Sequence, residues 1–286
     1  MICGGKKMVE VVAAIIRDRD KFLICQRPEN KKRALMWEFP GGKIEAGETP
    51  EAALKRELME ELGIKAKPES MFFDTVYEYP DITVHITFYN TYIIGGEITQ
   101  KEHHDIRWIS ADEVDLFTFC PADKGIIDKI VEKENKRREV LKNLTVECAK
   151  ENDLDDILCL YTQLSPINDG SGDVHGVFGN ILKNEGQYII LAKVNGKAVS
   201  SCALNIIQNL THGARPYAVV ENVVTEKEYR GFGLASACLD RARDLAKEHN
   251  CYKIMLMTGS KKESTLRFYE QAGYDRYSKT AMNQRL

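Results

Sequence analysis

Apolar residues in the first half of the chain follow strand and helix spacings in turn. Two apolar runs, at residues 9–17 and 22–26, flank a polar turn and predict a hairpin of two strands. Leu54, Leu58 and Leu62 then recur every four residues, which predicts a helix with one buried stripe. The remaining segments of this half predict strands at 71–79, 82–94 and 105–109 and a helix at 122–138.

The helix with the leucine stripe has well-defined ends in the sequence. Thr49 supplies a hydroxyl N-cap, and Pro50 follows at the first helical position. Gly63 is a natural stop, because glycine adopts the left-handed conformation that closes a helix. The sequence therefore predicts a helix between residues 49 and 63.

Three glutamates on this helix predict a cation site. Glu57, Glu60 and Glu61 stand at i, i+3 and i+4, so they share one face and repel each other by about 0.2–0.5 kcal/mol per pair. A hard divalent cation, Mg²⁺ or Mn²⁺, offsets such repulsion, and it prefers oxygen ligands. Gly41-Gly42 lets the backbone approach the metal closely, and Arg56 is placed to orient a glutamate.

The pattern of apolar and polar residues changes after the charged run 132–142. We therefore predict two domains, at residues 8–140 and 144–286. Asn195-Gly196 between two apolar runs is a strong hairpin signal. Asp153 is predicted to cap a helix, and 166–179 reads as a loop. Further strands are predicted at 144–149, 188–194, 198–207, 217–225 and 252–257, the last one buried, and helices at 153–164, 234–249 and 264–272. This order predicts an α/β (α+β) protein.

Composition narrows the functional classes. With 286 residues and a net charge of −3, the chain gives no support for a nucleic-acid polymer or a membrane as partner. Neither a signal peptide nor a long apolar run is present, so a cytoplasmic location is expected. No CxxC pair occurs among the eight cysteines, which are predicted to be reduced core residues.

The glutamate helix lies in a complete sequence motif. Residues 42–64 fit the pattern G-x5-E-x7-R-E-U-x-E-E-x-G-U, where U is a bulky aliphatic, at every specified position. The matching residues are Gly42, Glu48, Arg56, Glu57, Leu58, Glu60, Glu61, Gly63 and Ile64. This segment is identified as a Nudix box. The resemblance implies an α/β/α sandwich with a mixed sheet and a Mg²⁺-dependent hydrolase of nucleoside diphosphates linked to another group.

The first domain as a whole resembles the MutT-like branch of the Nudix enzymes, which includes 8-oxo-dGTP hydrolases and CTP pyrophosphohydrolases. The resemblance rests on residues 11–28, on 37–64 and on CPAD at 120–123. It implies hydrolysis of a nucleoside triphosphate at an internal phosphorus, giving nucleoside monophosphate and pyrophosphate. The metal-binding residues implied are Gly41, Glu57, Glu60 and Glu61, and the nucleotide-binding residues are Arg27, Glu38, Phe39 and Asp123.

Several of these roles have alternatives. Phe39 is equally suited to the core, and Asp123 either contacts the base or caps the helix that follows Pro121. Glu102 matches a glutamate outside the motif that approaches the metal or activates water, yet it lies in a polar loop. Either Glu57 or Glu102 is the catalytic base. His103-His104 reads as a surface loop, because adjacent histidines point to opposite sides and rarely chelate together.

Residues 220–235 resemble the GNAT family of N-acetyltransferases. The family signature Q/R-x-x-G-x-G/A is matched by Arg230, Gly233 and Ala235, after a predicted strand and at the start of a predicted helix. The resemblance implies a mixed central sheet and an acetyl-CoA site. The residues assigned to that site are Val223, Val224, Arg230, Gly231, Phe232, Gly233, Leu234 and Ala235.

The catalytic residues of this second half are less fixed. Tyr269 is the candidate acid for the CoA thiolate, or else a packing residue, and Glu221 is the candidate base, or else an edge residue. An asparagine that often precedes the tyrosine in the family is missing. The loop 166–179 would cover the site of an unknown acceptor amine.

The leading interpretation is a bifunctional enzyme whose two halves use a metal and acetyl-CoA. One alternative makes the C-terminal half a non-catalytic acetyl-CoA-binding or dimerisation module. Another makes the Nudix half a hydrolase of CoA or a dinucleotide, although the segment before the motif favours a triphosphate. Oligomeric state and coupling of the two reactions stay open.

Overall fold

The computed structural model describes residues 8–164 and 172–284. These residues form two compact units, 1–135 with 262–264 and 136–261 with 265–286, and each unit is an α/β structure. The division falls within helix α2 (Lys124–Lys142). In the part of the chain that is described, no helix is long and apolar enough to cross a membrane.

The first unit is built on a seven-stranded mixed sheet. Strands are ordered β3-β2-β1-β6-β5, with β4 paired to β1 and β7 to β2. Only β1 and β6 are parallel among these pairs. The strands are β1 (Met8–Asp18), β2 (Lys21–Gln26), β3 (Trp37–Glu38), β4 (Gly41–Lys43), β5 (Lys65–Glu78), β6 (Thr83–Gly95) and β7 (Asp105–Ser110).

The predicted hairpin is correct only near its turn. Arg17 of β1 pairs with Phe22 of β2 beside that turn. Over most of its length, however, β1 pairs in parallel with β6, from Met8 to Ile16. Sequence pattern locates both strands but does not reveal this partner, because the pairing joins segments about seventy residues apart.

Helix α1 (Pro50–Leu62) has the predicted ends. The Thr49 hydroxyl accepts a hydrogen bond from the Ala52 N–H, and Gly63 closes the helix at φ 71°. Leu54, Leu58 and Leu62 are fully buried, as the leucine stripe predicts.

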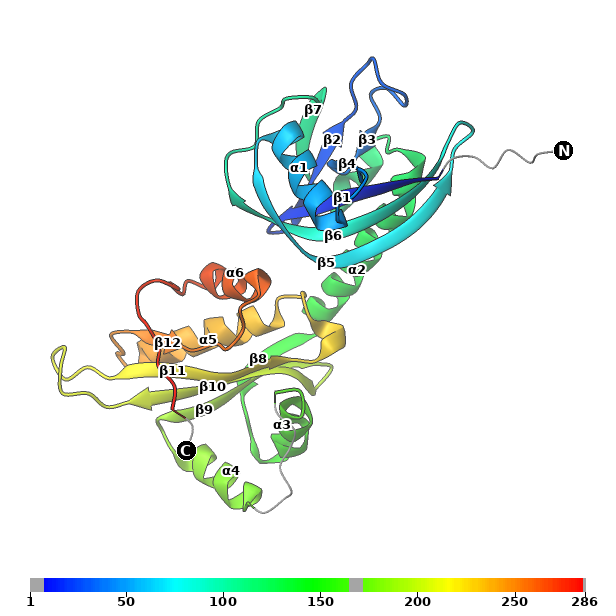
Figure 1. Cartoon of the computed structure of the whole chain (residues 1–286). Coiled ribbons are helices and arrows are strands. Elements are labelled where there is room, and N and C mark those ends of the chain that lie inside the picture. Colours follow the sequence, from blue (N-terminus) through cyan, green and yellow to red (C-terminus); the bar gives the residue numbers. More distant parts are fainter. Residues whose placement is uncertain (1–7, 165–171, 285–286) are drawn as a thin grey trace. The chain divides into compact units, whose positions relative to one another are not determined.

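Two helices cover opposite faces of the first sheet (Figure 1). Because side chains alternate along a strand, one face of β1 packs against α1 and the other against α2. The α1 cluster holds Val12, Ala14 and Ile16 of β1, whereas the α2 cluster holds Ala13 and Ile15. The first unit is therefore the α/β/α sandwich that the resemblance implied.

The second unit has a five-stranded mixed sheet, ordered β12-β11-β10-β9-β8. Only β11 and β12 pair in parallel. Its strands are β8 (Leu144–Cys148), β9 (Gln187–Val194), β10 (Lys197–Ile207), β11 (Tyr217–Thr225) and β12 (Ile254–Leu256). Its helices are α3 (Leu154–Tyr161), α4 (Val174–Lys183), α5 (Leu234–Glu248) and α6 (Glu263–Gln271).

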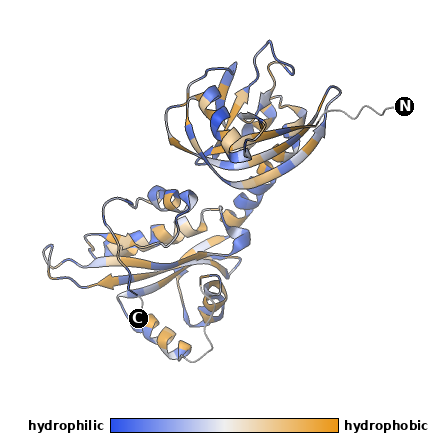
Figure 2. Ribbon diagram, in the orientation of Figure 1, coloured by the Kyte–Doolittle hydropathy of each residue, from blue (hydrophilic) through white to orange (hydrophobic). Residues whose placement is uncertain are grey.

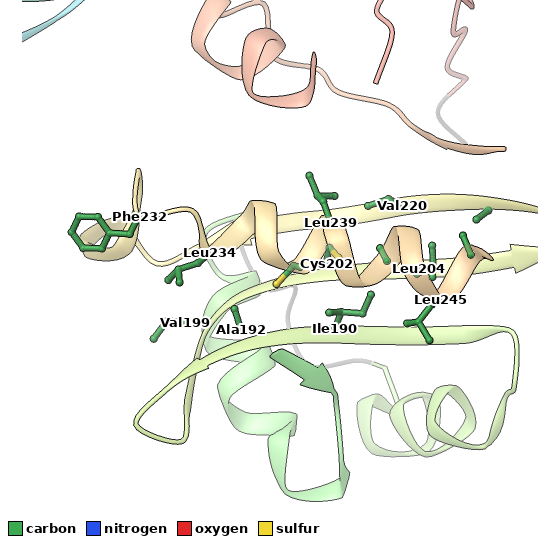
Figure 3. Close-up of a cluster of buried hydrophobic side chains, with 14 of the residues drawn as sticks. Ile190, Ala192, Val199, Cys202, Leu204, Val220, Phe232, Leu234, Leu239 and Leu245 are labelled. Atoms are coloured by element: carbon green, nitrogen blue, oxygen red, sulfur yellow. The ribbon is translucent and has the colours of Figure 1, made fainter. Parts of the chain in front are cut away.

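Helices flank both faces of this sheet as well (Figure 1). On one face α5 packs on the sheet through Leu234, Leu239 and Leu245, which meet Ile190 and Leu204 (Figure 3). On the other face α3 and α4 form a smaller cluster with β9. Hydrophobic residues are concentrated along the strands of both units (Figure 2), as expected for sheets buried between helices.

The predicted hairpin turn of the second unit is confirmed. Asn195 and Gly196 take positive φ values of 51° and 84°, the conformation of a type I′ turn. Asn195-Gly196 joins β9 and β10, which pair in antiparallel fashion. The local sequence is sufficient here because both residues tolerate positive φ.

Several expectations for the second unit are wrong. The Asp153 carboxylate does not cap α3; it accepts from the Lys150 N–H and pairs with Lys193 at 2.7 Å. Helix α4 occupies 174–179 of the predicted loop, whose residues 166–171 lie outside the described part. Strand β12 is half-buried rather than buried. Cys159 is exposed, and Cys148 and Cys251 are half-buried, so not every cysteine is a core residue.

Candidate active sites

A cavity of about 600 Å³ lies in the first unit, beside the second half of the glutamate helix. Its wall is formed by the loop after β2, by β4, by α1, by the loop before β7 and by the 3₁₀ helix η2 (Pro121–Asp123). Seven of the predicted site residues line it: Arg27, Glu38, Gly41, Glu57, Glu61, Glu102 and Asp123. Segments far apart in the sequence thus meet at one cavity.

Two predicted site residues lie elsewhere. The Phe39 side chain is buried in the core, stacked against Phe22 at 5.7 Å between ring centroids. Glu60 turns away from the cavity toward Arg56 and is 55% exposed. Helical spacing puts Glu60 on the correct side of α1, but a neighbouring cation holds its carboxylate outside.

Arg56 organises the glutamates of α1. Its guanidinium pairs with Glu48 at 3.0 Å, with Glu57 at 2.9 Å and with Glu60 at 3.3 Å. It also donates to the backbone carbonyl of Lys43 at 3.1 Å. These contacts fix the orientation of Glu57, and they tie α1 to the segment that follows β4.

Glu61 is the most unusual carboxylate of the site. Its side chain is buried, and its Oε2 atom has no hydrogen-bond partner among the described residues. Burial raises the pKa of Glu61 to about 8, with further contributions from Glu57, Glu38 and Glu102. A buried carboxylate oxygen without a donor, next to other carboxylates, is the environment that a hard cation stabilises.

The glycines before α1 allow close approach. A Cβ atom on Gly42 would lie 2.3 Å from the Glu57 carboxyl group, and one on Gly41 would lie 2.1 Å from the Val12 carbonyl oxygen. Gly41 also has φ +150°, which disfavours other residues. The backbone therefore passes directly against the Glu57 carboxylate.

These observations fit a divalent metal. Glu57 and Glu61, with the Gly41 backbone and Glu102, offer the oxygen ligands that Mg²⁺ prefers. Within residues 8–164 and 172–284, no three acidic, histidine or cysteine side chains already converge as a metal cage. This pattern suits an ion that brings part of its coordination shell from substrate and water.

The cavity is also lined by the polar side chains of Arg27, Glu38 and Asp123, of which Asp123 is buried. Arg27 pairs with Glu38 at 2.5 Å, and the Asp123 carboxylate accepts from the Phe39 backbone N–H. Burial, followed by the charge of Glu38, raises the pKa of Asp123 well above its usual range. Asp123 thus faces the cavity, where a bound base could contact it.

His103 was assigned wrongly to the surface. Its side chain is buried, and its Nε2 atom lies 3.7 Å from Glu61 Oε2, whereas His104 is exposed. Burial lowers the pKa of His103 to about 4, so the ring is neutral at neutral pH. The sequence argument concerned chelation by two histidines together, whereas the structure places a single histidine beside a candidate metal ligand.

The second unit holds the turn predicted to bind acetyl-CoA. Gly231 and Gly233 adopt positive φ values of 81° and 90°, and Gly233 is the N-cap of α5. A Cβ atom on Gly233 would meet none of the described atoms within 4 Å, so the space beside this N-cap residue is open within the described part of the chain. Backbone N–H groups there can receive an anion.

The side chains around this turn have structural roles. Phe232 and Leu234 are buried in the α5 core. The Arg230 guanidinium donates to the Thr225 carbonyl at 3.0 Å and to Gln163 Oε1 at 2.8 Å. Arg230 therefore braces the turn against β11 and the end of α3, and any phosphate contact here depends on the backbone.

Strand β11 contains a bulge next to the turn. Ser201 pairs with Val224 but Ala203 pairs with Glu221, so β11 has one residue more than β10 in this stretch. Asn222 has φ 53° at this point. Val223 is half-buried against the α5 core, and Val224 is buried on the other face. The bulge breaks the regular pairing beside both predicted valines.

The two predicted catalytic residues of this unit lie near one another. Burial, followed by the charges of Cys202 and Glu221, raises the pKa of Tyr269 above its usual value. The ring of Tyr269 also packs on the α5 core, so the packing role holds in any case. No sequence pattern pointed to the buried hydroxyls of Tyr161 and Ser201, which lack a well-formed hydrogen bond within the described ranges.

The folds of the two units belong to two different protein families. The model of the NUDIX domain matches residues 6–130, and that of the acetyltransferase (GNAT) family matches residues 154–274. The chain therefore belongs to the Nudix family and carries a GNAT domain, as its motifs predicted.

Individual relatives match one half each. An 8-oxo-dGTP diphosphatase of Haemophilus influenzae is 38% identical over 127 residues, covering 44% of this chain and 93% of the relative. A CTP pyrophosphohydrolase of Escherichia coli is 37% identical over 122 residues, covering 43% and 90%. The structure of a putative acetyltransferase from Agrobacterium tumefaciens is 37% identical, covers 50% of this chain and 99% of its own, and has a TM-score of 0.47.

Proposed function

We propose that the first unit hydrolyses a nucleoside triphosphate, normal or oxidised, to nucleoside monophosphate and pyrophosphate. The observation that carries the proposal is a single cavity lined by two kinds of group. It is lined by the carboxylates of Glu57 and Glu61, of which Glu61 is buried, and by the polar side chains of Arg27, Glu38 and Asp123. The similarity to an 8-oxo-dGTP diphosphatase and a CTP pyrophosphohydrolase supports this class of substrate.

Glu57, Glu61, Glu102 and the Gly41 backbone would hold Mg²⁺ or Mn²⁺. When bound, the ion would neutralise phosphate charge and lower the pKa of a water molecule. Arg56 keeps the Glu57 carboxylate at the cavity, and His103 packs behind Glu61. Glu57 or Glu102 would take the proton of the attacking water, and both line the cavity.

Glu38 and Asp123 would bind the base. Glu38, held by Arg27, and Asp123 would present carboxyl groups to the donors on a base edge. Guanine offers N1–H and N2–H₂ and cytosine offers N4–H₂, so these carboxyl groups suit either base. The Phe39 side chain would act from the core and support the wall.

A hydrolysis screen tests this proposal. It should cover normal and oxidised deoxynucleotides, CTP analogues, ADP-ribose and CoA, with Mg²⁺ and with pyrophosphate or monophosphate release as the readout. We expect a triphosphate to be the best substrate, and Glu61→Gln to lower its turnover by about two orders of magnitude or more, with the fold retained. Preference for CoA or a dinucleotide would refute the triphosphate assignment, and near-normal turnover by the variant would refute the role of Glu61.

For the second unit we propose acetyl-CoA-dependent transfer to an amine. The supporting observation is Gly233, which caps the N-terminus of α5 and whose Cβ would meet none of the described atoms within 4 Å. Glu221 would accept the proton of the amine, and Tyr269 would donate a proton to the departing thiolate.

Calorimetric titration with acetyl-CoA tests this second activity. Binding accompanied by CoA release in an amine screen would support an acetyltransferase. Binding without turnover would instead support a non-catalytic sensing or dimerisation module. An absence of binding at millimolar acetyl-CoA would contradict both versions and leave a scaffold.

A further inference from the structure

The loop between β2 and β3 brings three cationic side chains to the cavity of the first unit. Its base is closed by backbone hydrogen bonds from Arg27 N–H to the Met36 carbonyl and from Leu35 N–H to the Arg27 carbonyl. Lys31, Lys32 and Arg33 lie on this loop, and all three line the cavity.

Two of these cations are tied to the turn between β5 and β6. Lys32 pairs with Asp81 at 2.6 Å, and Arg33 pairs with the same carboxylate at 3.1 Å. The Arg33 guanidinium also lies 3.5 Å from the centroid of the Tyr79 ring. Arg33, whose side chain is 20% exposed, therefore holds the loop in place, whereas the Lys32 pair, with Lys32 74% exposed, contributes little.

Lys31 has a different partner. Its Nζ atom lies 3.1 Å from Glu102 Oε2, and the two side chains are 50% and 49% exposed. An ion pair this exposed contributes little to stability, because water screens both charges. Glu102 is also the carboxylate proposed to act on the metal or the water, and its charge contributes to the raised pKa of Glu61.

Electrostatics favour an exchange at this position. Glu38, Glu57 and Glu102 all line the cavity, and the charge of Lys31 acts on both Glu38 and Glu102. A terminal phosphate group carries more negative charge than one carboxylate and offers three acceptor oxygens. Such a group can replace Glu102 as the ion-pair partner of Lys31 at a small cost in free energy.

We propose that Lys31 binds the terminal phosphates of the nucleotide, and that this contact replaces its ion pair with Glu102. The inference rests on the proposed triphosphate hydrolysis and adds a phosphate-binding residue outside the Nudix motif. Release of Glu102 then coincides with arrival of the phosphates, so the carboxylate becomes free when the substrate is in place.

Calorimetry with the two expected products tests the phosphate contact. Inorganic pyrophosphate represents the terminal phosphates, and the nucleoside monophosphate represents the remainder, both with Mg²⁺. We expect Lys31→Gln to weaken pyrophosphate binding about tenfold, the loss of one charge-assisted hydrogen bond, and to leave monophosphate binding within about twofold. Lys31→Arg should retain most of the affinity.

A matched control removes a lysine that does not line the cavity. Lys55 is exposed on α1, so Lys55→Gln causes the same change in net charge and should keep the wild-type affinity for pyrophosphate. Equal pyrophosphate affinity in wild type and Lys31→Gln would overturn the proposal. An equal loss in Lys31→Gln and Lys55→Gln would also overturn it, because only overall charge would then matter.

Chemical labelling tests the exchange on the unmodified chain. An amine-reactive ester, read by mass spectrometry, should label Lys31 less when Mg²⁺ and pyrophosphate are present, and the monophosphate should give no such protection. A purely structural pair with Glu102 predicts equal labelling with and without pyrophosphate, and this result would refute the exchange.

The two proposals can fail separately. Protection of Lys31 by pyrophosphate, together with no hydrolysis of any triphosphate, would support the phosphate contact and refute the proposed function. Triphosphate hydrolysis, together with an unchanged pyrophosphate affinity in Lys31→Gln, would support the proposed function and refute the phosphate contact.

Discussion

Gly42→Ala should separate the activity of the first unit from its stability. The added Cβ would lie 2.3 Å from the Glu57 carboxyl group, whereas ordinary contact begins at 3.4 Å, so the carboxylate must move by 1.1 Å. A displacement of about 1 Å at a reacting group lowers turnover by about 10²-fold. Because the obstructed atoms are the end of a flexible side chain, the backbone need not move.

The stability of this variant should change little. Replacing glycine by alanine at an unstrained position stabilises a protein by about 0.4–1 kcal/mol through the unfolded state, and this offsets part of the cost of displacing Glu57. Arg56 keeps its ion pair with Glu48 when Glu57 moves. We expect urea denaturation within about 1 kcal/mol of wild type, with metal-dependent pyrophosphate release reduced about a hundredfold.

Two other glycines provide the comparison. Gly95→Ala introduces a Cβ 3.7 Å from Lys65, an ordinary contact, and should preserve both activity and stability. Gly41→Ala places a Cβ 2.1 Å from the Val12 carbonyl at φ +150° and should destabilise the unit as well. Wild-type turnover by Gly42→Ala would refute the argument that backbone proximity to Glu57 is needed for catalysis.

Two further predictions concern ion pairs. The His85 ring bridges Asp74 and Glu10, which raise its pKa, so its stabilising effect is complete below the unfolded pKa of about 6.5 and is lost as pH rises through the folded value. Urea denaturation from pH 5.5 to 9 should show wild type losing its advantage over His85→Gln, and a constant difference would contradict this. Lys193 is buried between Glu147 and Asp153, so Lys193→Met should lower the free energy of unfolding by about 3 kcal/mol. Lys150 belongs to an exposed pair, so Lys150→Met should lower it by only about 0–1 kcal/mol. Equal losses of unfolding free energy in these two variants would show that burial of the pair is unimportant.

Local patterns predicted local structure well. Thr49, Pro50 and Gly63 fix the ends of α1, and Asn195-Gly196 fixes a turn, because each acts through its own backbone conformation. Capping propensity predicted the wrong role for Asp153, because its carboxylate pairs with Lys193, which lies on a strand forty residues away. Capping propensity is local, but the choice between a cap and an ion pair depends on tertiary neighbours.

The candidate sites show the same contrast between features set by local sequence and features set by tertiary contacts. Glu57 and Glu61 were found because one helix carries them at fixed spacing. His103 and Lys31 were missed, because their positions behind Glu61 and beside Glu102 depend on how two loops fold over the cavity. Glu60 has the helical spacing of a ligand, but its carboxylate pairs with Arg56 and does not line the cavity, so its role at a metal stays a prediction.

Both units use glycine to bring backbone close to a charged group, but with opposite electrostatics. Before α1, Gly42 passes against the Glu57 carboxylate, beside the buried Glu61 carboxyl group, whose Oε2 atom has no hydrogen-bond partner among the described residues and is suited to a cation. Before α5, Gly233 leaves the helix N-terminus open, where N–H groups and the helix dipole favour an anion directly. Phosphate binding by the first unit should therefore depend on divalent metal, whereas CoA binding by the second should persist in a chelator. One titration of the intact chain with pyrophosphate and acetyl-CoA, with and without metal, examines both electrostatic arguments, and metal-dependent CoA binding would contradict the second.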